Sequence, residues 1–492
     1  MSLECFENLS AAELSRALGE GIISCRELTE RCLLRIAEFD RRGPALKAVI
    51  SVNPSALEEA EDLDRRFRGK AAPGPLHGIP VLLKDNVETK GLVTTSGSLS
   101  LADYVPDNDA FIVQKLRKAG AIVLAKANMH EFAVWGESVS SILGQALNPY
   151  DLTRTPGGSS GGTGAGIAAC FAAAGIGTDT VNSIRSPASA CCCVGIRPTL
   201  GLVSRRGITP YSLDQDTAGP ICRTVEDAAL VLDTIAGYDP MDPQTAWCTG
   251  HIPPSYRDFI AREGLKGKRL GILTGFFGGG PEHREVNAAM GQCMIAMRDG
   301  GAELMEVQDT PDPDGLLYEV SVHLHTFKND LEGYLKSFGG KVPYHTLEEL
   351  MGSGKIHPGI LDNMKTAAGL GRDSTGYAAR TVAGLRLRTR IMKIFADLSL
   401  DALLFPHQRK LVVAAGESQT ERNGVLGAVT GFPAIVVPGG FSRPTGTAPG
   451  GVPIGLELLG PPWSEGNLIS IAHSFEQLTR FRRPPFSTPP LS

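Results

Sequence analysis

Apolar residues recur at helical and at strand spacing along most of the chain, and the two spacings alternate. Residues 10–40 predict an amphipathic helix pair, with Ser10 and Ser24 as N-cap residues. Further on, the short apolar runs "GIPVLLK" and "AIVLAKA" flank the helical run "DNDAFIVQKLRKAG", which ends at Gly120. Short buried strands that alternate with longer helices are typical of a sheet covered on both faces. We therefore expect an α/β fold with a large mixed, twisted sheet.

The pattern changes between about 310 and 400, where helical periodicity continues and strand signals nearly vanish. Strand-like runs return as "DALLFP", "AIVVPGGF" and "PIGLELLG". This predicts a mainly helical insertion on the substrate side of the sheet, followed by a return to the central sheet in residues 400–492. We interpret residues 1–492 as a single large domain that begins with helices in residues 1–70.

Composition and charge narrow the choice of partners. The chain has 492 residues, of which 42% are hydrophobic, and 48 Lys and Arg oppose 53 Asp and Glu for a net charge of −5. Because no block of like charges is present, we expect neither nucleic acid nor an anionic membrane as a partner. No apolar stretch reaches the roughly 20 residues of a membrane span, so we expect a cytoplasmic protein. Ten cysteines lack the paired spacing of zinc or redox sites, and we interpret them as reduced and buried.

The run "PGGSSGGTGAG" at residues 156–166 sets two serines among many glycines. Each glycine costs about 0.5–1 kcal/mol against alanine in an element interior, so this density indicates a constrained backbone or a close ligand. One interpretation is a G-x-S-x-G nucleophile elbow with Ser159 attacking, but the preceding "NPYDLTRTP" is polar and turn-like where that motif needs a strand. A second is a phosphate cradle, but the lysine of the P-loop motif is missing.

A third interpretation comes from several pieces that occur together in order. They are "GIPVLLKDN", "TTSGS", "RTPGGSSGG", "GTDTVNSIRSPAS", "VGIRPTLGLVS" and "GPICRTVEDAA". Residues 75–230, which contain them, resemble the core of the amidase signature family, and "GFPAIVVPGGF" and "GVPIGLELLGPP" resemble its C-terminal sheet segments. The resemblance implies the amidase signature fold.

The resemblance also implies three catalytic residues: Lys84 as base, Ser159 as proton relay and Ser183 as nucleophile. A cis peptide between Gly158 and Ser159 is implied as well, with the helix "GTGAGIAACFAAAG" holding the loop. The chemistry is reasonable because burial of Lys84 among apolar neighbours would lower its pKa and supply a neutral amine.

An oxyanion hole is implied at the backbone N–H groups of Thr180, Val181, Asn182 and Ser183. The family carries two glycines where this chain has Val181 and Asn182. Since valine is hard to place at positive φ, either the backbone at position 181 has ordinary angles or the site differs from the norm. We expect the side chains at these two positions to act through loop conformation.

Other conspicuous residues are given structural roles. Asp179 and Arg185 flank the predicted nucleophile and predict a structural ion pair under the loop. His323 and His325 lie in the helical insertion, where we expect surface residues or a pocket wall. No metal or cofactor is needed by the implied mechanism.

The implied activity is hydrolysis of a carboxylic amide, or of an ester, carbamate or urea-type bond, through an acyl-enzyme on Ser183. This makes the chain an amidohydrolase acting on C–N bonds other than peptide bonds. Relatives place the positions of Ala133, Val134 and Trp135 at the acyl site, and because this piece has no cationic clamp we favour a neutral, partly apolar small-molecule amide. Packing of Trp135 and of the neighbouring Phe132 in the core is the competing interpretation.

The main alternative is a partner-dependent amidotransferase-type subunit, or a non-catalytic subunit of an assembly. The resemblance implies a glutamine after "SIR" in the amidotransferase group, where this chain has Ser186. The altered Val181-Asn182 pair keeps the alternative open. A homodimer is the self-association that we consider for the enzyme.

Overall fold

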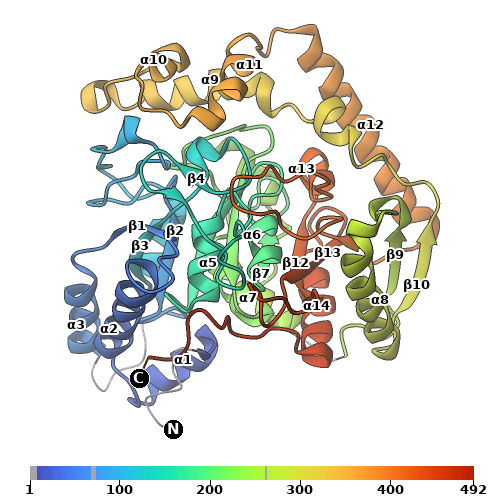
Figure 1. Ribbon diagram of the computed structural model, residues 1–492, viewed down its shortest axis with the longest axis horizontal. Helices are drawn as coiled ribbons and strands as arrows, with labels where there is room; N and C mark the ends of the chain where they lie inside the picture. The colour runs from blue at the N-terminus through green and yellow to red at the C-terminus, as the bar shows by residue number, and fades with distance from the viewer. Residues whose placement is uncertain (1–7, 68–73, 261–262, 492) are drawn as a thin grey trace.

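A computed structural model describes residues 8–67, 74–260 and 263–491 of the protein (Figure 1). Residues 1–7, which include Cys5, and residues 68–70 belong to the segment predicted as N-terminal helices and lie outside the described residues. Strands and helices alternate over most of the described chain, as the hydrophobic pattern predicts.

The sheet strands are β1 (Val49–Val52), β2 (Pro80–Lys84), β3 (Ile122–Ala127), β6 (Ala174–Asp179), β7 (Val194–Arg197), β8 (Thr217–Cys222), β9 (Arg269–Leu273), β10 (Glu303–Val307), β11 (Ala402–Pro406), β12 (Ala434–Phe441) and β13 (Pro453–Leu459). They form one 11-stranded sheet in the order β1-β3-β2-β6-β8-β7-β12-β13-β11-β9-β10. Strand β2 runs parallel to β3 and β6, whereas β6 pairs antiparallel with β8. The predicted mixed sheet is therefore confirmed.

The α-helices are α1 (Ala11–Gly19), α2 (Cys25–Arg35), α3 (Ala56–Phe67), α4 (Phe111–Lys118), α5 (Gly161–Ala168), α6 (Arg185–Ala190), α7 (Val225–Ile235), α8 (Arg284–Asp299), α9 (His323–Lys336), α10 (Leu347–Gly352), α11 (Leu361–Ala368), α12 (Thr375–Leu398), α13 (Val425–Thr430) and α14 (Glu465–Thr479). A π-helix, η9 (Leu316–Val320), precedes α9, and a short hairpin joins β4 (Val139–Ser140) to β5 (Gly144–Gln145).

Local signals placed the first helices correctly. Ser10 and Ser24 both accept a hydrogen bond from the backbone N–H three residues on, and Glu13 and Glu27 complete the two capping boxes. Helix α4 ends just before Gly120, whose φ of +89° suits glycine.

The helix predicted over residues 162–175 is shorter than expected. Helix α5 ends at Ala168, Cys170 has a φ of +58°, and Ala174 begins strand β6. A run of glycine and alanine carries neither helical nor strand periodicity, so the pattern could not place this boundary. Strands β1, β6, β7, β8, β9 and β10 were not predicted as strands either, and β1 lies within the segment interpreted as N-terminal helices.

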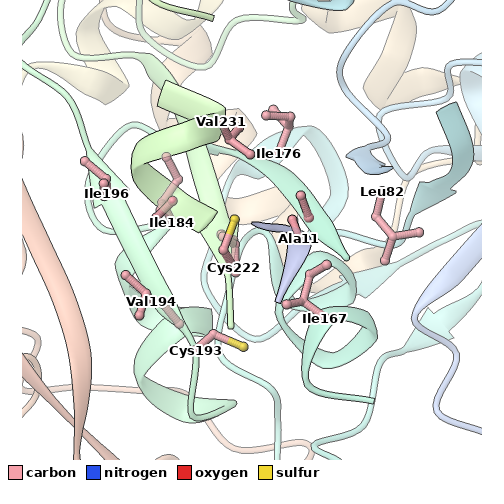
Figure 2. Close-up of a cluster of buried hydrophobic side chains, with 14 of the residues drawn as sticks. Ala11, Leu82, Ile167, Ile176, Ile184, Cys193, Val194, Ile196, Cys222 and Val231 are labelled. Carbon is pink, nitrogen blue, oxygen red and sulfur yellow. The ribbon is translucent and has the colours of Figure 1, made fainter. Parts of the chain in front are cut away.

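Helices cover both faces of the sheet, which is visible at β6. A Cβ on Gly175 would meet Thr163 and Ile167 of α5, so this face of β6 contacts α5. The neighbouring Ile176 points to the opposite face, and Figure 2 shows it beside Val231 of α7. The predicted coverage of both faces is thus confirmed.

The cysteines belong to this apolar interior. Cys193 and Cys222 are drawn within the buried cluster in Figure 2, and all nine described cysteines are buried free thiols. Thiols in such surroundings pack as small hydrophobic side chains.

Between Val307 and Ala402 the described chain contains helices and no strand. Helices α9, α10 and α11 lie above the ends of the central strands, and the long α12 descends toward β9 and β10 (Figure 1). The helices α9 to α11 share a second hydrophobic cluster that includes Phe327, Leu350 and Met364. The predicted helical insertion is present and covers one end of the sheet.

Close packing around the glycine-serine run predicts that an added methyl group there destabilises the protein. A Cβ on Gly162 would lie 2.4 Å from Asn128 O and 2.5 Å from Ala48 O. Gly162→Ala should therefore lower the free energy of unfolding by about 1–3 kcal/mol, as overpacking does elsewhere. Gly291→Ala is the matched control, because Gly291 lies in α8 with open space around its Cα and should gain about 0.5–1 kcal/mol. Thermal and urea unfolding monitored by circular dichroism measure both; equal effects would contradict the packing argument.

Candidate active site

Lys84 is the last residue of β2 and is completely buried. Its Nζ donates to Ser159 Oγ at 2.7 Å and to Thr178 Oγ1 at 2.8 Å. Thr178 lies on β6, the strand that pairs with β2. The sheet itself therefore fixes the distance between Lys84 and Thr178. Two of the three predicted catalytic residues are thus in hydrogen-bond contact.

Burial lowers the pKa of Lys84 to about 7, because an ammonium ion loses its hydration inside the protein. The carboxylates of Asp179 and Asp216 act in the opposite direction and limit the shift. At neutral pH a substantial share of Lys84 is therefore an uncharged amine, which has a lone pair for a proton.

The loop that carries Ser159 has the backbone that the resemblance implies. The Gly158–Ser159 peptide is cis, and Gly157 has a φ of +69°. Ser159 O accepts from His130 N at 3.0 Å, and Ser160 N donates to Ser183 O at 3.2 Å. The segment before Ser159 is loop and bend, so the strand that a nucleophile elbow requires is not there.

Ser183 lies in the turn between β6 and α6 and is 5% exposed. It lines a pocket together with Thr180, Val181 and Asn182. The hydrogen bond from Ser160 N to Ser183 O joins this turn to the Ser159 loop. The third predicted catalytic residue is therefore on the pocket wall, and its loop is tied to that of the second.

The carbonyl groups in the turn all point into the protein. Gln215 Nε2 donates to Thr180 O at 3.1 Å, Arg185 Nη2 to Val181 O at 2.8 Å, and Ser186 N to Asn182 O at 2.7 Å. In a planar trans peptide the N–H points opposite to the carbonyl. The N–H groups of Val181, Asn182 and Ser183 are thus held away from these anchors, and within the described chain none of them donates to a protein acceptor.

The two residues that replace the usual glycines fit this turn. Val181 is not among the described residues with positive φ, and its side chain packs against the cluster that contains Val425 and Val429 of α13. Asn182 is buried, and its Nδ2 has no hydrogen-bond partner among the described residues. The first option of the sequence analysis, ordinary backbone angles at position 181, is the one observed.

Charged residues support the turn from below. Arg185 Nη2 contacts Asp179 Oδ1 at 3.1 Å, and Arg197 Nη1 contacts the same oxygen at 2.8 Å. The two guanidinium groups hold the pKa of Asp179 well below its usual range, although burial opposes them. The predicted Asp179–Arg185 ion pair is confirmed, and it extends through Arg185 to Glu457, a contact that the sequence analysis missed.

The predicted substrate residues Ala133, Val134 and Trp135 all line the pocket. Ala133 and Val134 also belong to the second hydrophobic cluster. Trp135, for which core packing was the competing interpretation, is only partly buried and belongs to none of the hydrophobic clusters of the described residues. Phe132 is buried in that cluster and is not part of the pocket lining. The Arg422 guanidinium lies over Trp135, 5.3 Å from its ring, and Arg422 Nη2 contacts Glu137 Oε1 at 2.7 Å.

Arg422 was missed because it is almost 290 residues from Trp135 in sequence, in "QTERNG". The sequence analysis found no cationic clamp in the 133–135 piece itself, and the cation beside this piece comes from a distant segment, where Glu137 neutralises it. No local signal links these two segments.

The insertion histidines have different surroundings. His323 is buried and lines the pocket, and burial lowers its pKa to about 3, so it is neutral. His325 is also buried, with Nδ1 3.0 Å from Ser374 Oγ. The pocket-wall expectation is right for His323, whereas a surface position is wrong for both.

Two searches of the described residues complete the inventory. No group of three or more His, Cys, Asp or Glu side chains is arranged to hold a metal ion. Among the described helices, none combines the length and the apolar character needed to cross a membrane.

A mixed sheet that buries a lysine beside one serine, with a second serine under unpaired peptide N–H groups, defines a serine-dependent acyl hydrolase. Comparison with known families supports this class, because the family model named Amidase matches residues 27–469. The chain belongs to the amidase family and is an amidase-family enzyme.

Several relatives match over nearly their whole length. The structure of native peptide amidase from Stenotrophomonas maltophilia is similar, with 36% identity, a TM-score of 0.89, and coverage of 98% of this chain and 99% of that one. A glutamyl-tRNA(Gln) amidotransferase subunit of Moorella thermoacetica is 36% identical over 96% of this chain and 97% of that protein. A probable amidase of Arabidopsis thaliana is 35% identical over 95% and 90% of the two chains.

Removal of the buried cation under the turn should destabilise the fold. Arg185→Met leaves Asp179 and Glu457 with less compensation in the interior, so we expect a loss of about 3–5 kcal/mol of unfolding free energy. Arg390→Met is the matched control, because the Arg390–Asp309 pair is exposed and should contribute at most about 1 kcal/mol. Urea unfolding distinguishes the two, and a loss under about 1 kcal/mol in Arg185→Met would count against the network.

Proposed function

We propose that the protein hydrolyses the C–N bond of a carboxamide through a covalent acyl-enzyme on Ser183. The observation that carries this proposal is the completely buried Lys84, with a pKa near 7 and its Nζ 2.7 Å from Ser159 Oγ. A neutral amine in hydrogen-bond reach of a serine is the arrangement needed to activate a hydroxyl nucleophile.

Each step of the proposed hydrolysis can be assigned to a residue of the site. Neutral Lys84 accepts the Ser159 proton while Ser159 takes the proton of Ser183, and Ser183 Oγ attacks the carbonyl carbon. The carbonyl oxygen becomes an oxyanion, for which the unpaired N–H groups of Val181, Asn182 and Ser183 are the proposed donors. Lys84 returns the proton through Ser159 to the leaving nitrogen, and the C–N bond breaks. Water then attacks the ester on Ser183 and gives a proton to Lys84 through Ser159. The ester bond breaks, the acid leaves, and Ser183 Oγ takes the proton back.

The Thr180 N–H is the fourth donor that the resemblance implies, and it stays in the proposal, because it donates to no acceptor within the described chain. The Thr180 carbonyl has a second part: anchored by Gln215, it orients the Val181 N–H of the same peptide group.

The pocket favours a neutral acyl group. Ala133, Val134 and Trp135 offer apolar and aromatic surface, and the nearby Arg422 is already paired with Glu137. We propose a small, partly apolar amide, with cleavage of C–N bonds other than peptide bonds. The name of the peptide amidase among the structural relatives makes amides of short peptides a second substrate class to include in the test.

The names of several relatives support a second function, that of an amidotransferase-type subunit. Several relatives, including the one from Moorella thermoacetica, are named as subunits of glutamyl-tRNA(Gln) amidotransferase. The alternative is therefore a chain that releases ammonia from an amide only within an assembly.

Assay of the purified chain separates the two functions. The autonomous enzyme should hydrolyse at least one member of a panel of aryl amides, peptide amides, esters and carbamates without a partner. Turnover of none of them, combined with glutamine hydrolysis that appears only after addition of a cell extract, would favour the partner-dependent function. Sedimentation velocity in the same buffer tests the homodimer.

The nucleophile assignment predicts the position of a covalent label. Incubation with a fluorophosphonate should add one label per chain, and peptide mass spectrometry should find it on Ser183, since this serine lines the pocket. Ser183→Ala should lose the label, whereas Ser186→Ala, which alters a nearby serine outside the proposed triad, should retain it. Labelling of Ser159 would instead revive Ser159 as the attacking residue.

The base assignment predicts a pH dependence. Lys84 is active when deprotonated, and its pKa is lowered to about 7, so kcat/KM should rise with pH through a midpoint near 7 and then level off. Lys84→Ala should lose at least about 100-fold in kcat, at the lower end of what a general base contributes. Lys126→Met is a demanding control, because Lys126 is also buried but contacts Val87 O and Thr94 instead of a proposed catalytic residue. A folded Lys84→Ala variant with near wild-type turnover would refute the lysine mechanism.

A further inference from the structure

Gln215 connects the turn that carries Ser183 to the helical insertion. Its side chain is buried, and Nε2 donates to Thr180 O at 3.1 Å. On the other side, Oε1 accepts from Val322 N at 2.7 Å and from Ser321 Oγ at 3.0 Å. The amide nitrogen of Gln215 therefore binds the turn, and the amide oxygen binds the insertion.

The bond to Thr180 fixes the direction of a proposed oxyanion donor. Thr180 O and Val181 N–H belong to the same peptide plane and point in opposite directions. If the anchor at Thr180 O is lost, this plane can rotate and the Val181 N–H no longer has a fixed position. Because catalytic donors work by being oriented in advance, a rotation would reduce stabilisation of the oxyanion.

The bonds to Ser321 and Val322 lie where the insertion lines the pocket. These residues join η9 to α9, and Leu317, Tyr318 and His323 on the two sides of the junction line the pocket. Ser321 Oγ is also 2.7 Å from His323 Nδ1. A substrate that presses on this part of the wall thus contacts the segment that Gln215 holds.

The remaining contacts make the connection stiff. Arg197 Nη2 donates to Gln215 O at 2.8 Å, and Arg380 Nη1 of α12 donates to Ser321 O at 2.7 Å. Each end of this connection is held to a different part of the fold. The Gln215 side chain therefore joins the insertion to the turn by hydrogen bonds, beside the apolar packing of Val181, Leu317 and Val320 against a common cluster.

We propose that Gln215 is a positioning residue that couples substrate contact at the insertion to the orientation of the Val181 N–H. This inference rests on the proposed function of the same site. Substrates whose acyl group is long enough to reach Tyr318 and His323 are hydrolysed with a higher kcat because of the Gln215 hydrogen bonds, whereas an acetyl substrate does not have this increase.

The test compares acetyl and 3-phenylpropionyl p-nitroanilides on the wild type and on Gln215→Glu. The glutamate keeps the acceptor for Val322 N but places an oxygen against Thr180 O. We expect kcat for the longer substrate to fall about 10-fold or more, and by clearly more than kcat for the acetyl substrate, while KM changes less than about 3-fold. A loss of this size is below the roughly 100-fold that removal of a whole oxyanion donor produces.

Three further variants separate coupling from a general structural role. Ser321→Ala removes one of the two donors to Oε1 and should cause a smaller loss in the same direction. Gln215→Met removes both amide groups without adding charge, and provides the measurement if the buried carboxylate unfolds the chain. Gln114→Glu is the matched control, since Gln114 is an exposed residue of α4 whose Nε2 also donates to a backbone carbonyl, Asp109 O; it should behave as the wild type.

Turnover is expressed per fluorophosphonate-reactive chain, and melting curves confirm folding. Unchanged kcat in both Gln215 variants, or an equal loss with the two substrates, would overturn the coupling while leaving the proposed function intact. A wild-type chain that neither labels at Ser183 nor hydrolyses any amide would overturn the proposed function, and this inference with it.

Discussion

The site depends above all on one buried amine. Lys84 Nζ has no access to water and lies 2.7 Å from Ser159 Oγ, and the loss of hydration brings the pKa of this lysine to about 7. The sheet provides the burial: β2 is an inner strand between β3 and β6, and every residue of it is buried. A lysine on an edge strand would stay hydrated and charged. The position of the strand in the sheet therefore decides whether Lys84, the proposed base, is an uncharged amine.

The second constraint is the direction of four consecutive peptide groups. Carbonyl anchors on residues 180 to 182 leave three N–H groups facing away from the anchors, and Ile184 N is taken by Asp179. This arrangement explains how Val181 and Asn182 can stand where the family has glycines. Because the anchors hold the backbone at ordinary angles, the positive φ that favours glycine is not needed at Val181. The side chains are then free for packing, and Val181 joins the cluster beneath α13.

The pocket wall is assembled from segments that are distant in sequence. Trp135 comes from the N-terminal half, His323 from the insertion and Arg422 from the segment before α13. Substrate preference can therefore change with the insertion or with the 419–425 segment, while the buried lysine and the two serines stay on the sheet and its nearest loops.

The sequence by itself determined the α/β class, the first helices with their caps, the helical insertion, and the identity of Lys84, Ser159 and Ser183 as candidates. The helices and the insertion depend on local periodicity and on capping residues, which are written in consecutive residues. The three catalytic candidates come instead from the resemblance of short ordered motifs to the amidase signature family. Tertiary structure alone decided the boundary between α5 and β6, the strands β1 and β6 to β10, and the contacts of Arg422, Glu457 and Gln215. The glycine-rich run has no period, and the three side chains meet partners from 35 to nearly 290 residues away. Such pairings are set by the packing of the whole chain, so no stretch of sequence contains them.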